Sequence, residues 1–270
     1  MQLGVNVPNF GPGTDPGVLR EWARVVAGLG FDLLMVSDHV AVTPDVAERY
    51  PEPFYDPFAT LSWLAGASDG GLRLGTTVLV LPYRHPLLVA RMASSLQRLS
   101  GGRFVLGVGV GWARQEFDAL GVPFGERGRL TDTCLGVLRE TWRTAAGDAP
   151  AVWVGGHSAA AIRRVLRYGD AWHPLRLPVE RMRSVLADHA LPGFAPRIAL
   201  RLTDAPVEEA DRPAGVGDPE QVVGDLADLR ALGAETVVLD PYDGDPAQTL
   251  RPEAAWRALA TVAERWRMTS

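Results

Sequence analysis

The segment LGTTVLVLPYRHPLLVARMASSLQRL, residues 74–99, contains the pattern that decides the fold. Its first part, residues 74–81, is a short run that is apolar apart from Thr76 and Thr77, which is typical of a strand buried on both faces. Pro86 then opens a segment in which apolar residues recur every three or four positions, as they do on one face of a helix. This segment therefore predicts a buried strand followed by an amphipathic helix.

The same pattern recurs along the chain. The other strands are expected at residues 3–7, 31–36, 104–108, 151–154, 171–172, 198–202 and 236–239. The other helices are expected at residues 16–29, 57–67, 114–120, 127–144, 158–169, 179–189, 218–229 and 256–266. Eight strand–helix units in about 250 residues predict an α/β fold, a (β/α)8 TIM barrel, formed by a single domain over residues 1–270.

A doubly wound parallel sheet is the alternative architecture. The first expected strand is followed by Pro8, Asn9, Phe10 and Gly11 rather than by the glycine fingerprint of a dinucleotide-binding turn, so the barrel is preferred. In a barrel, the active site lies at the carboxyl ends of the strands. The long connections 41–55 and 203–217 leave such ends and are therefore candidate lids or substrate loops.

The composition narrows the chemistry. The net charge is −5, and the 27 basic residues are all arginine. Without lysine, Schiff-base catalysis and a lysine-dependent phosphate loop are excluded, and a proton-transfer base has to be His, a carboxylate or Tyr. The negative charge and the absence of a basic run argue against a nucleic-acid partner.

Cysteine usage and hydropathy indicate the setting of the protein. Cys134 is the only cysteine, which excludes an intrachain disulfide and a cysteine-cluster zinc site and fits a cytoplasmic protein. No run approaches 18 consecutive apolar residues, and no charged leader precedes an apolar core, so no membrane association and no processing are expected. No metal is expected either, because the five histidines lack close ligand spacing.

Asp38 and His39 directly follow the second expected strand. In a barrel, His39 would point into the mouth, where it could exchange a proton or donate a hydrogen bond. The alternative is that one of the two side chains only holds the following loop. His85 and His173 also lie at strand ends, and loop hydrogen bonds are their expected role.

Three alternating glycines end the fourth expected strand. They are Gly107, Gly109 and Gly111, and Trp112 follows them. Such glycines predict either the close approach of a flat ligand to the backbone or a simple bend. Trp112 would accordingly form a wall of the pocket or belong to the core.

A second glycine turn, Gly155, Gly156, His157 and Ser158, follows the fifth expected strand and opens a helix. Exposed amides at a helix N-terminus form an anion site, which suits a phosphate. The structural alternative is a tight turn with Ser158 as an ordinary helix cap.

Together these segments resemble the luciferase-like family of flavin and deazaflavin oxidoreductases. The matching stretches are residues 31–40 (FDLLMVSDHV), 72–86 (LRLGTTVLVLPYRHP), 104–121 (FVLGVGVGWARQEFDALG), 152–174 (VWVGGHSAAAIRRVLRYGDAWHP) and 217–239. The family fold is a (β/α)8 barrel, and its members bind reduced FMN or the deazaflavin coenzyme F420 at the carboxyl ends of the strands. The resemblance implies that the partner of the protein is a small organic substrate. It is also compatible with a homodimer.

The resemblance also implies roles for individual residues. It places Asp38 and His39 at the cofactor ring and the reaction centre. It places Thr77 and Val78 where deazaflavin members have a non-proline cis peptide behind the ring. The remaining cofactor contacts that it implies are Gly109, Gly111 and Trp112, with Gly155, Gly156, His157 and Ser158 at the phosphate.

One well-known deazaflavin subgroup of this family differs from this chain in the residues that follow the fourth strand. It has a Gly-Glu acid after the fourth strand, where this chain has Gly111 and Trp112. The difference puts that subgroup's proton donor and its sugar-phosphate substrates in question for this chain.

Three functions are then compatible with the sequence. The leading one is hydride transfer between reduced F420 and an organic substrate, because the Ser37-Asp38-His39 segment favours the deazaflavin, which hardly reacts with oxygen. The closest rival is an FMN-dependent monooxygenase that uses the same pocket. The third is a catalytically silent barrel that binds a flavin-like ligand.

Overall fold

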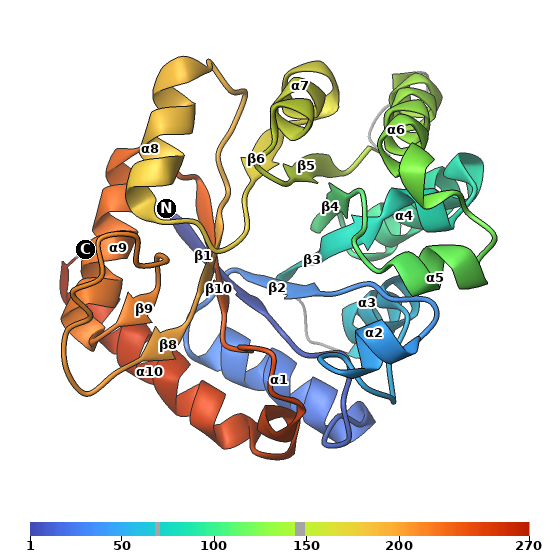
Figure 1. Cartoon of the computed structure of the whole chain (residues 1–270). Coiled ribbons are helices and arrows are strands. Elements are labelled where there is room, and N and C mark those ends of the chain that lie inside the picture. The colour runs from blue at the N-terminus through green and yellow to red at the C-terminus, as the bar shows by residue number, and fades with distance from the viewer. Residues whose placement is uncertain (68–70, 144–148, 270) are drawn as a thin grey trace.

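A computed structural model describes residues 1–67, 71–143 and 149–269, and its strands form a parallel barrel surrounded by helices (Figure 1). The barrel strands are β1 (Gln2–Asn6), β2 (Leu33–Val36), β3 (Arg73–Val80), β4 (Phe104–Gly109), β5 (Ala151–Gly155), β6 (Ala171–His173), β7 (Arg197–Ala199) and β10 (Thr236–Asp240). Their order in the sheet is β6-β5-β4-β3-β2-β1-β10-β7. The predicted (β/α)8 TIM barrel is confirmed.

The seam between β6 and β7 closes the barrel with isolated bridges instead of a continuous ladder. Trp172 is bridged to Phe194, and Leu175 is bridged to Arg197. The rings of Trp172 and Phe194 also stack, with their centroids 5.6 Å apart. Backbone hydrogen bonds also cross the seam, from the N–H of Trp172 to the carbonyl of Gly193 (2.9 Å) and from the N–H of Ala195 to the carbonyl of Trp172 (2.9 Å).

Helices cover the outer face of the barrel (Figure 1). The long ones are α1 (Pro16–Gly28), α3 (Pro57–Ala67), α4 (Pro86–Leu99), α6 (Arg127–Arg143), α7 (Ala159–Tyr168), α8 (Val179–Asp188), α9 (Pro219–Ala231) and α10 (Pro252–Thr269). The short α2 (Pro44–Ala47) and α5 (Arg114–Ala119) lie in the loops after β2 and β4. Thr144, the expected end of one helix, lies outside the described residues. Within those residues, no helix has the length and apolar character needed to cross a membrane.

Several helices begin where the sequence indicates. Asp15 caps α1 by accepting the N–H of Val18, and a proline follows it at the first helical position. Asp218 and Gln221 form the predicted capping box of α9. These local signals explain why the helical part of the prediction succeeds.

The expected strand 198–202 is wrong in its second half. Arg197–Ala199 forms β7, whereas the next residues form β8 (Arg201–Leu202), which pairs with β9 (Val216–Gly217) in a separate two-stranded sheet. Leu200 marks the end of the barrel strand, where its N–H donates to the carbonyl of Asp240 (2.8 Å). The apolar run continues past this point, so the sequence does not show that the chain changes partner.

The connection 203–217, a candidate lid, is held against α9. The buried carboxylate of Asp225 accepts hydrogen bonds from both terminal nitrogens of Arg212 (2.7 and 2.8 Å) and from the N–H of Gly215 (2.7 Å). These bonds fix its second half. The connection 41–55 is held as well, because the N–H of Gly11 donates to the carbonyls of Pro51 (3.0 Å) and Pro53 (2.9 Å).

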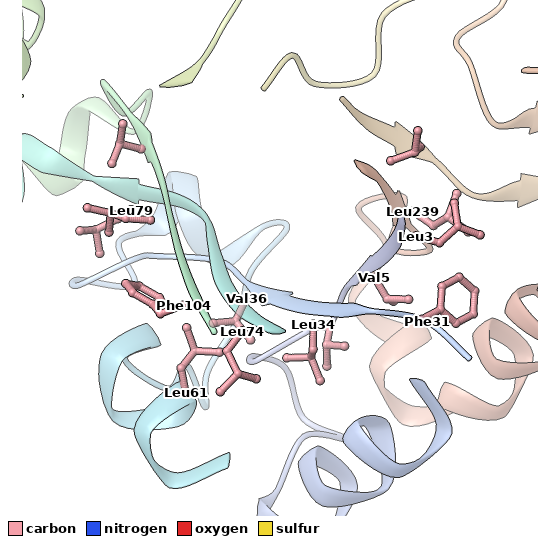
Figure 2. Packing of buried hydrophobic residues seen from close by; sticks show 14 of the residues in the cluster. Leu3, Val5, Phe31, Leu34, Val36, Leu61, Leu74, Leu79, Phe104 and Leu239 are labelled. Atoms are coloured by element: carbon pink, nitrogen blue, oxygen red, sulfur yellow. The ribbon is translucent and has the colours of Figure 1, made fainter. Parts of the chain in front are cut away.

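Alternate residues of each strand enter two different apolar layers. Leu34 and Val36 face outward from β2, where they pack beside Leu61 of α3 and Leu74 of β3 (Figure 2). A second cluster fills the barrel interior, and its members are Leu33, Met35, Val105, Trp153, Ala171, Ala195 and Val238. Full burial of one such aliphatic or aromatic side chain contributes about 1.5–3 kcal/mol.

A buried polar layer follows the apolar interior, and three of its members end their strands: Asn6 ends β1, His173 ends β6 and Asp240 ends β10. Its members are Asn6, Thr77, His173, Arg197 and Asp240. Polar side chains in this position need partners, because an unpaired buried polar group is costly. The candidate site is built on this layer.

Gly107 sets the distance between β3 and β4. A Cβ there would lie 2.0 Å from the carbonyl oxygen of Thr76. Because a carbonyl within the sheet cannot move far, Gly107→Ala is expected to lower the free energy of unfolding by about 3 kcal/mol in urea denaturation. The control is Gly224→Ala in α9, where a Cβ meets nothing within 4 Å. It should be neutral or stabilise by about 0.5–1 kcal/mol, and equal stability of the two variants would contradict the prediction.

Candidate active site

A cavity of about 280 Å³ opens at the carboxyl end of the barrel. Its lining consists of Thr77, Val78, Gly109, Val110, Gly155, Gly156, His157, His173, Leu175 and Arg197. Six of the nine residues expected to contact a cofactor are among them. Larger hollows, of about 500 and 660 Å³, involve α10 on the outside of the barrel. The strand-end cavity is the one that brings the predicted residues together.

The other three expected cofactor contacts lie outside the lining. Gly111 has a φ of +80°, and a Cβ there would lie within 3 Å of the side chains of Val80 and Phe117. Trp112 is 49% exposed. The hydroxyl of Ser158 accepts the N–H of Ala161 (3.2 Å) as the cap of α7. Their contact with a cofactor stays a prediction.

Thr77 and Val78 form part of the cavity lining, and the peptide bond between them is cis, as the resemblance implies. A Cβ at Gly109 would lie 2.5 Å from Val78 Cγ2, and one at Gly155 would lie 3.2 Å from Val78 Cγ1. Both glycines therefore make room for the Val78 side chain. Packing within the protein thus explains part of the glycine pattern.

His173 lies deep in the cavity and is held neutral. Burial is the main reason that its pKa falls from 6.5 to about 4, since the carbonyl of Ala195 only partly opposes the effect and Arg197 adds to it. The Nδ1–H donates to that carbonyl, so Nε2 is left to accept the hydroxyl of Thr77 (2.9 Å). The expected loop role of His173 is thus replaced by a place in the lining of the cavity.

Asp240 is the centre of the polar layer. Its carboxylate is buried and accepts hydrogen bonds from Asn6 (3.0 Å), Arg176 (2.7 Å) and Arg197 (2.8 Å). Burial opposes its ionisation, but the charges of Arg197 and Arg176 outweigh that effect and lower the pKa of Asp240. Arg197 also donates to the Thr77 carbonyl (2.6 Å), which links this layer to the lining.

The carboxylate of Asp38 is buried, and both of its oxygens accept hydrogen bonds. Its two oxygens accept hydrogen bonds from the two terminal nitrogens of Arg84 (2.7 and 2.8 Å), and one also accepts the N–H of Val80 (2.9 Å). Burial raises the pKa of this carboxyl, while Arg84 counteracts the shift. Asp38 thus joins the ends of β2 and β3, and it is not part of the cavity lining.

His39 is bound by an acid that comes from α5. Its Nδ1 lies 2.7 Å from Oε2 of Glu116, whose other oxygen accepts the N–H groups of Val40 (2.5 Å) and Ala41 (3.0 Å). Tyr83 donates its hydroxyl to the same Oε2 (2.8 Å). Burial opposes ionisation of Glu116, but His39 and the two N–H groups prevail and lower its pKa.

An ionised Glu116 accepts a hydrogen bond from Nδ1 of His39 and so keeps a proton on that nitrogen. The Nε2 atom of His39 makes no hydrogen bond with the residues that the structure describes, and His39 is not among the residues that line the cavity. Its expected part in proton exchange stays a prediction. Tyr50 stacks on the His39 ring with centroids 5.2 Å apart, and Phe54 and Trp112 meet the ring edge-to-face (5.4 and 5.7 Å). The connection 41–55 therefore packs directly against the candidate catalytic side chain.

Sequence reasoning missed Glu116, although a signal is present. The expected helix 114–120 has an apolar face that includes Phe117 and Leu120, and Glu116 stands beside Phe117 and one turn before Leu120. A carboxylate on an apolar helix face needs a buried partner. No comparable local signal marks Arg197 or Asp240, which lie in different strands. Across the described ranges, no three His, Cys, Asp or Glu residues are grouped as a metal site would require.

A family model for the luciferase-like monooxygenases matches residues 1–190, which is more than half of the chain. The chain belongs to the luciferase-like monooxygenase family. Its relatives include an uncharacterised protein of Mycobacterium tuberculosis, 32% identical over 56% of this chain and 62% of the relative. Another is a phthiodiolone/phenolphthiodiolone dimycocerosates ketoreductase of Mycobacterium kansasii, 29% identical over 60% of this chain and 54% of the relative. The chain thus matches less than two thirds of the length of these luciferase-like relatives.

Solved structures share the luciferase-like fold. The oxygenating constituent of 3,6-diketocamphane monooxygenase from Pseudomonas putida, in complex with FMN, has a TM-score of 0.72 at 15% identity, covering 98% of this chain and 97% of its own. The F420-dependent tetrahydromethanopterin reductase of Methanopyrus kandleri has a TM-score of 0.69 at 14% identity, covering 98% and 97%. At such low identity the likeness establishes the barrel alone.

The buried His173 makes stability depend on pH. Its pKa is about 4 in the folded protein against 6.5 ordinarily, so between these values the unfolded chain binds a proton that the folded protein does not. The free energy of unfolding should therefore fall by roughly 3 kcal/mol as the pH decreases across this window. Urea unfolding at several pH values measures the loss. His173→Gln should reduce it and the exposed control His189→Gln should not; an unchanged loss in His173→Gln would refute the assignment.

Proposed function

We propose that this luciferase-like protein is an F420-dependent oxidoreductase that transfers a hydride between the deazaflavin and a small organic molecule. One observation carries the proposal: residues that the resemblance assigns to the cofactor line a single cavity at the strand ends. At the same end of the barrel, the free Nε2 of His39 offers a group that can exchange a proton. The Glu116 carboxylate orients His39 and is its positioning residue.

The turn before α7 fits a phosphate. Among the described residues, none accepts the N–H groups of His157 or Ser158, and these groups lie at the N-terminus of a ten-residue helix. The carbonyl of Gly156 accepts the indole N–H of Trp172 (2.7 Å) and is thereby held in place. Fixed free amides of this kind suit the phosphate of FMN or F420.

The rest of the cavity fits a ring. Val78, Val110 and Leu175 supply apolar surface, while Thr77 and Arg197 supply polar groups at the floor. When bound there, a reduced deazaflavin supplies the hydride. The chain itself supplies the binding surface, a fixed neutral His173 and the proton-exchanging nitrogen of His39.

The related proteins support reduction and also define the alternative. The Mycobacterium kansasii relative is named a ketoreductase, and one solved structure of this fold is an F420-dependent reductase. The Pseudomonas putida structure of the same fold contains FMN, so an FMN-dependent monooxygenase is the second candidate. A phosphate-binding turn suits both FMN and F420. The preference for one cofactor must therefore come from the contacts that the protein makes with the cofactor ring.

The cofactor preference is tested by titration. Purified protein is titrated with reduced F420 and, separately, with reduced FMN under anaerobic conditions, and the dissociation constants are measured by fluorescence. F420 is expected to bind at least roughly tenfold more tightly, a difference of about 1.4 kcal/mol. Comparable or tighter binding of FMN would overturn the F420 assignment. If a cofactor binds but none of a panel of ketones and alcohols is turned over, the result would favour the catalytically silent barrel.

His39 is tested by two substitutions. His39→Ala should lower turnover, followed by the absorbance of F420, roughly 10²–10⁴-fold, the usual effect of losing an acid–base group. His39→Asn can keep a hydrogen bond to the buried Glu116 while removing the proton-exchanging ring, so it separates catalysis from folding. Turnover of His39→Asn close to that of the natural protein would reduce His39 to a structural residue.

Gly156 tests the phosphate turn. It has a φ of +99°, and a Cβ there would lie 3.1 Å from Cβ of Ala161. Gly156→Ala is expected to weaken F420 binding roughly tenfold, by displacing the amides from their positions. The matched control is Gly233→Ala, with a φ of +89° and nothing within 4 Å of the added Cβ. It should show a similar loss in thermal stability with unchanged affinity; unchanged affinity in both variants would mean that the phosphate lies elsewhere.

A further inference from the structure

We infer that a groove beside α10 binds a small amphiphile, a molecule with an apolar chain and one anionic group. The groove, here called the α10 groove, has a volume of about 660 Å³, which is within the range of ligand pockets. None of the described residues in its lining belongs to the lining of the strand-end cavity, so it is a separate site. The inference does not depend on the proposed function.

Segments that are far apart in the sequence form the α10 groove. Leu200 and β8 supply one part of the lining, and the chain after β10 supplies a second part, which includes the 3₁₀ helix η3 (Pro246–Leu250). The first turns of α10 supply the third part, and β8 lies beside this helix (Figure 1). Because these segments meet only in the folded chain, the groove depends on the tertiary structure.

Leucines and alanines supply the apolar part of the lining. Leu200 and Leu202 come from the β8 side, and Leu250, the last residue of η3, is 58% exposed. Ala254 and Ala258 are one turn apart on α10, so their short side chains lie on the same face of the helix and leave space above it. A large apolar side chain left exposed beside such a hollow indicates a surface that the apolar part of a ligand covers.

Three exposed arginines supply the positive charge of the α10 groove. They are Arg201 of β8, Arg251 just before α10 and Arg257 within α10. With the residues that the structure describes, their side chains form no hydrogen bond, ion pair or contact with an aromatic ring. A guanidinium group offers five N–H donors in a planar fork that matches a carboxylate or a phosphate. Three such groups without partners in one lining predict that the ligand carries an anionic group.

Two acidic side chains of the same lining, Asp243 and Asp245, oppose this charge only in part. The carboxylate of Asp243 accepts the N–H of Asp245 (3.2 Å), and the carboxylate of Asp245 accepts the N–H of Ala247 (2.9 Å). Both acids are therefore engaged by the backbone of their own turn. Among the described residues, neither forms an ion pair with an arginine of the groove. The N-terminus of α10 adds a positive partial charge, so an anion is favoured over a cation.

The test uses four probes that share an eight-carbon chain and differ in charge: octyl phosphate, octanoate, 1-octanol and octyltrimethylammonium. Their dissociation constants are measured by calorimetry on the full protein. We expect the tighter-binding of the two anions to bind at least roughly tenfold more tightly than 1-octanol or octyltrimethylammonium. The comparison of octyl phosphate with octanoate identifies which anionic group the α10 groove prefers.

Two variants with matched controls locate the binding. The combined variant Arg201→Gln, Arg251→Gln and Arg257→Gln should weaken anion binding roughly tenfold and leave 1-octanol binding unchanged. Its control is Arg267→Gln, at an exposed arginine of α10 outside the lining, which should change neither.

Leu250→Ser should weaken the binding of the anion and of 1-octanol alike, roughly tenfold, because both use the apolar surface. Its control is Leu99→Ser, at a leucine of α4 that is 72% exposed, and it should change nothing.

The outcomes separate this inference from the proposed function. The inference would be overturned if no probe bound, or if 1-octanol or octyltrimethylammonium bound as tightly as the anions. Equal anion binding by the combined arginine variant and by Arg267→Gln would overturn it too, since the probe would then bind elsewhere, for example in the strand-end cavity. Failure of the F420 titration affects the proposed function alone, and failure of the octyl probes affects the α10 groove alone.

Discussion

The buried carboxylate of Asp240 is the interaction on which the architecture of the site depends. It ties β10 to β1 through Asn6, to β7 through Arg197 and to the chain after β6 through Arg176. Arg176 and Arg197 lie on the two sides of the junction between β6 and β7, where the backbone ladder is interrupted. A buried ion pair contributes little net stability compared with apolar packing, but removal of one partner is strongly destabilising. The chief contribution of Asp240 is therefore to fix the geometry of the seam.

That fixed geometry extends across the barrel to the cavity. Arg197 donates to the carbonyl of Thr77, and the hydroxyl of Thr77 donates to the neutral His173. The Oδ1 atom of Asn6 is buried without a hydrogen-bond partner among the described residues, so the layer retains one unused acceptor. The floor of the cavity is thus a network whose members hold one another in single orientations, which is the preorganisation that a binding site requires.

The sequence indicated the fold because the information is local. Apolar runs, caps and prolines specify each strand and helix within a few residues, as the capping box that begins with Asp218 illustrates. The partner of a buried charge is not local. His39 and Glu116 are 77 residues apart, and Arg197 and Asp240 are 43 apart, so no spacing rule connects them. The prediction that the barrel strand continues to Leu202 is wrong for the same reason. The residues of β8 pair with β9, and this pairing is set by tertiary structure.

The two ends of the site differ in how freely they can change. The turn at Gly156 is joined to the seam, because its carbonyl accepts the indole N–H of Trp172. The connection 41–55 instead packs over the mouth, and its α2 makes no part of the barrel sheet. Mutations in that connection can alter the surroundings of His39 while the strand-end cavity keeps its lining. A barrel divided in this way tolerates variation unevenly: one loop can diverge while the strands, and the cavity that they form, keep their structure.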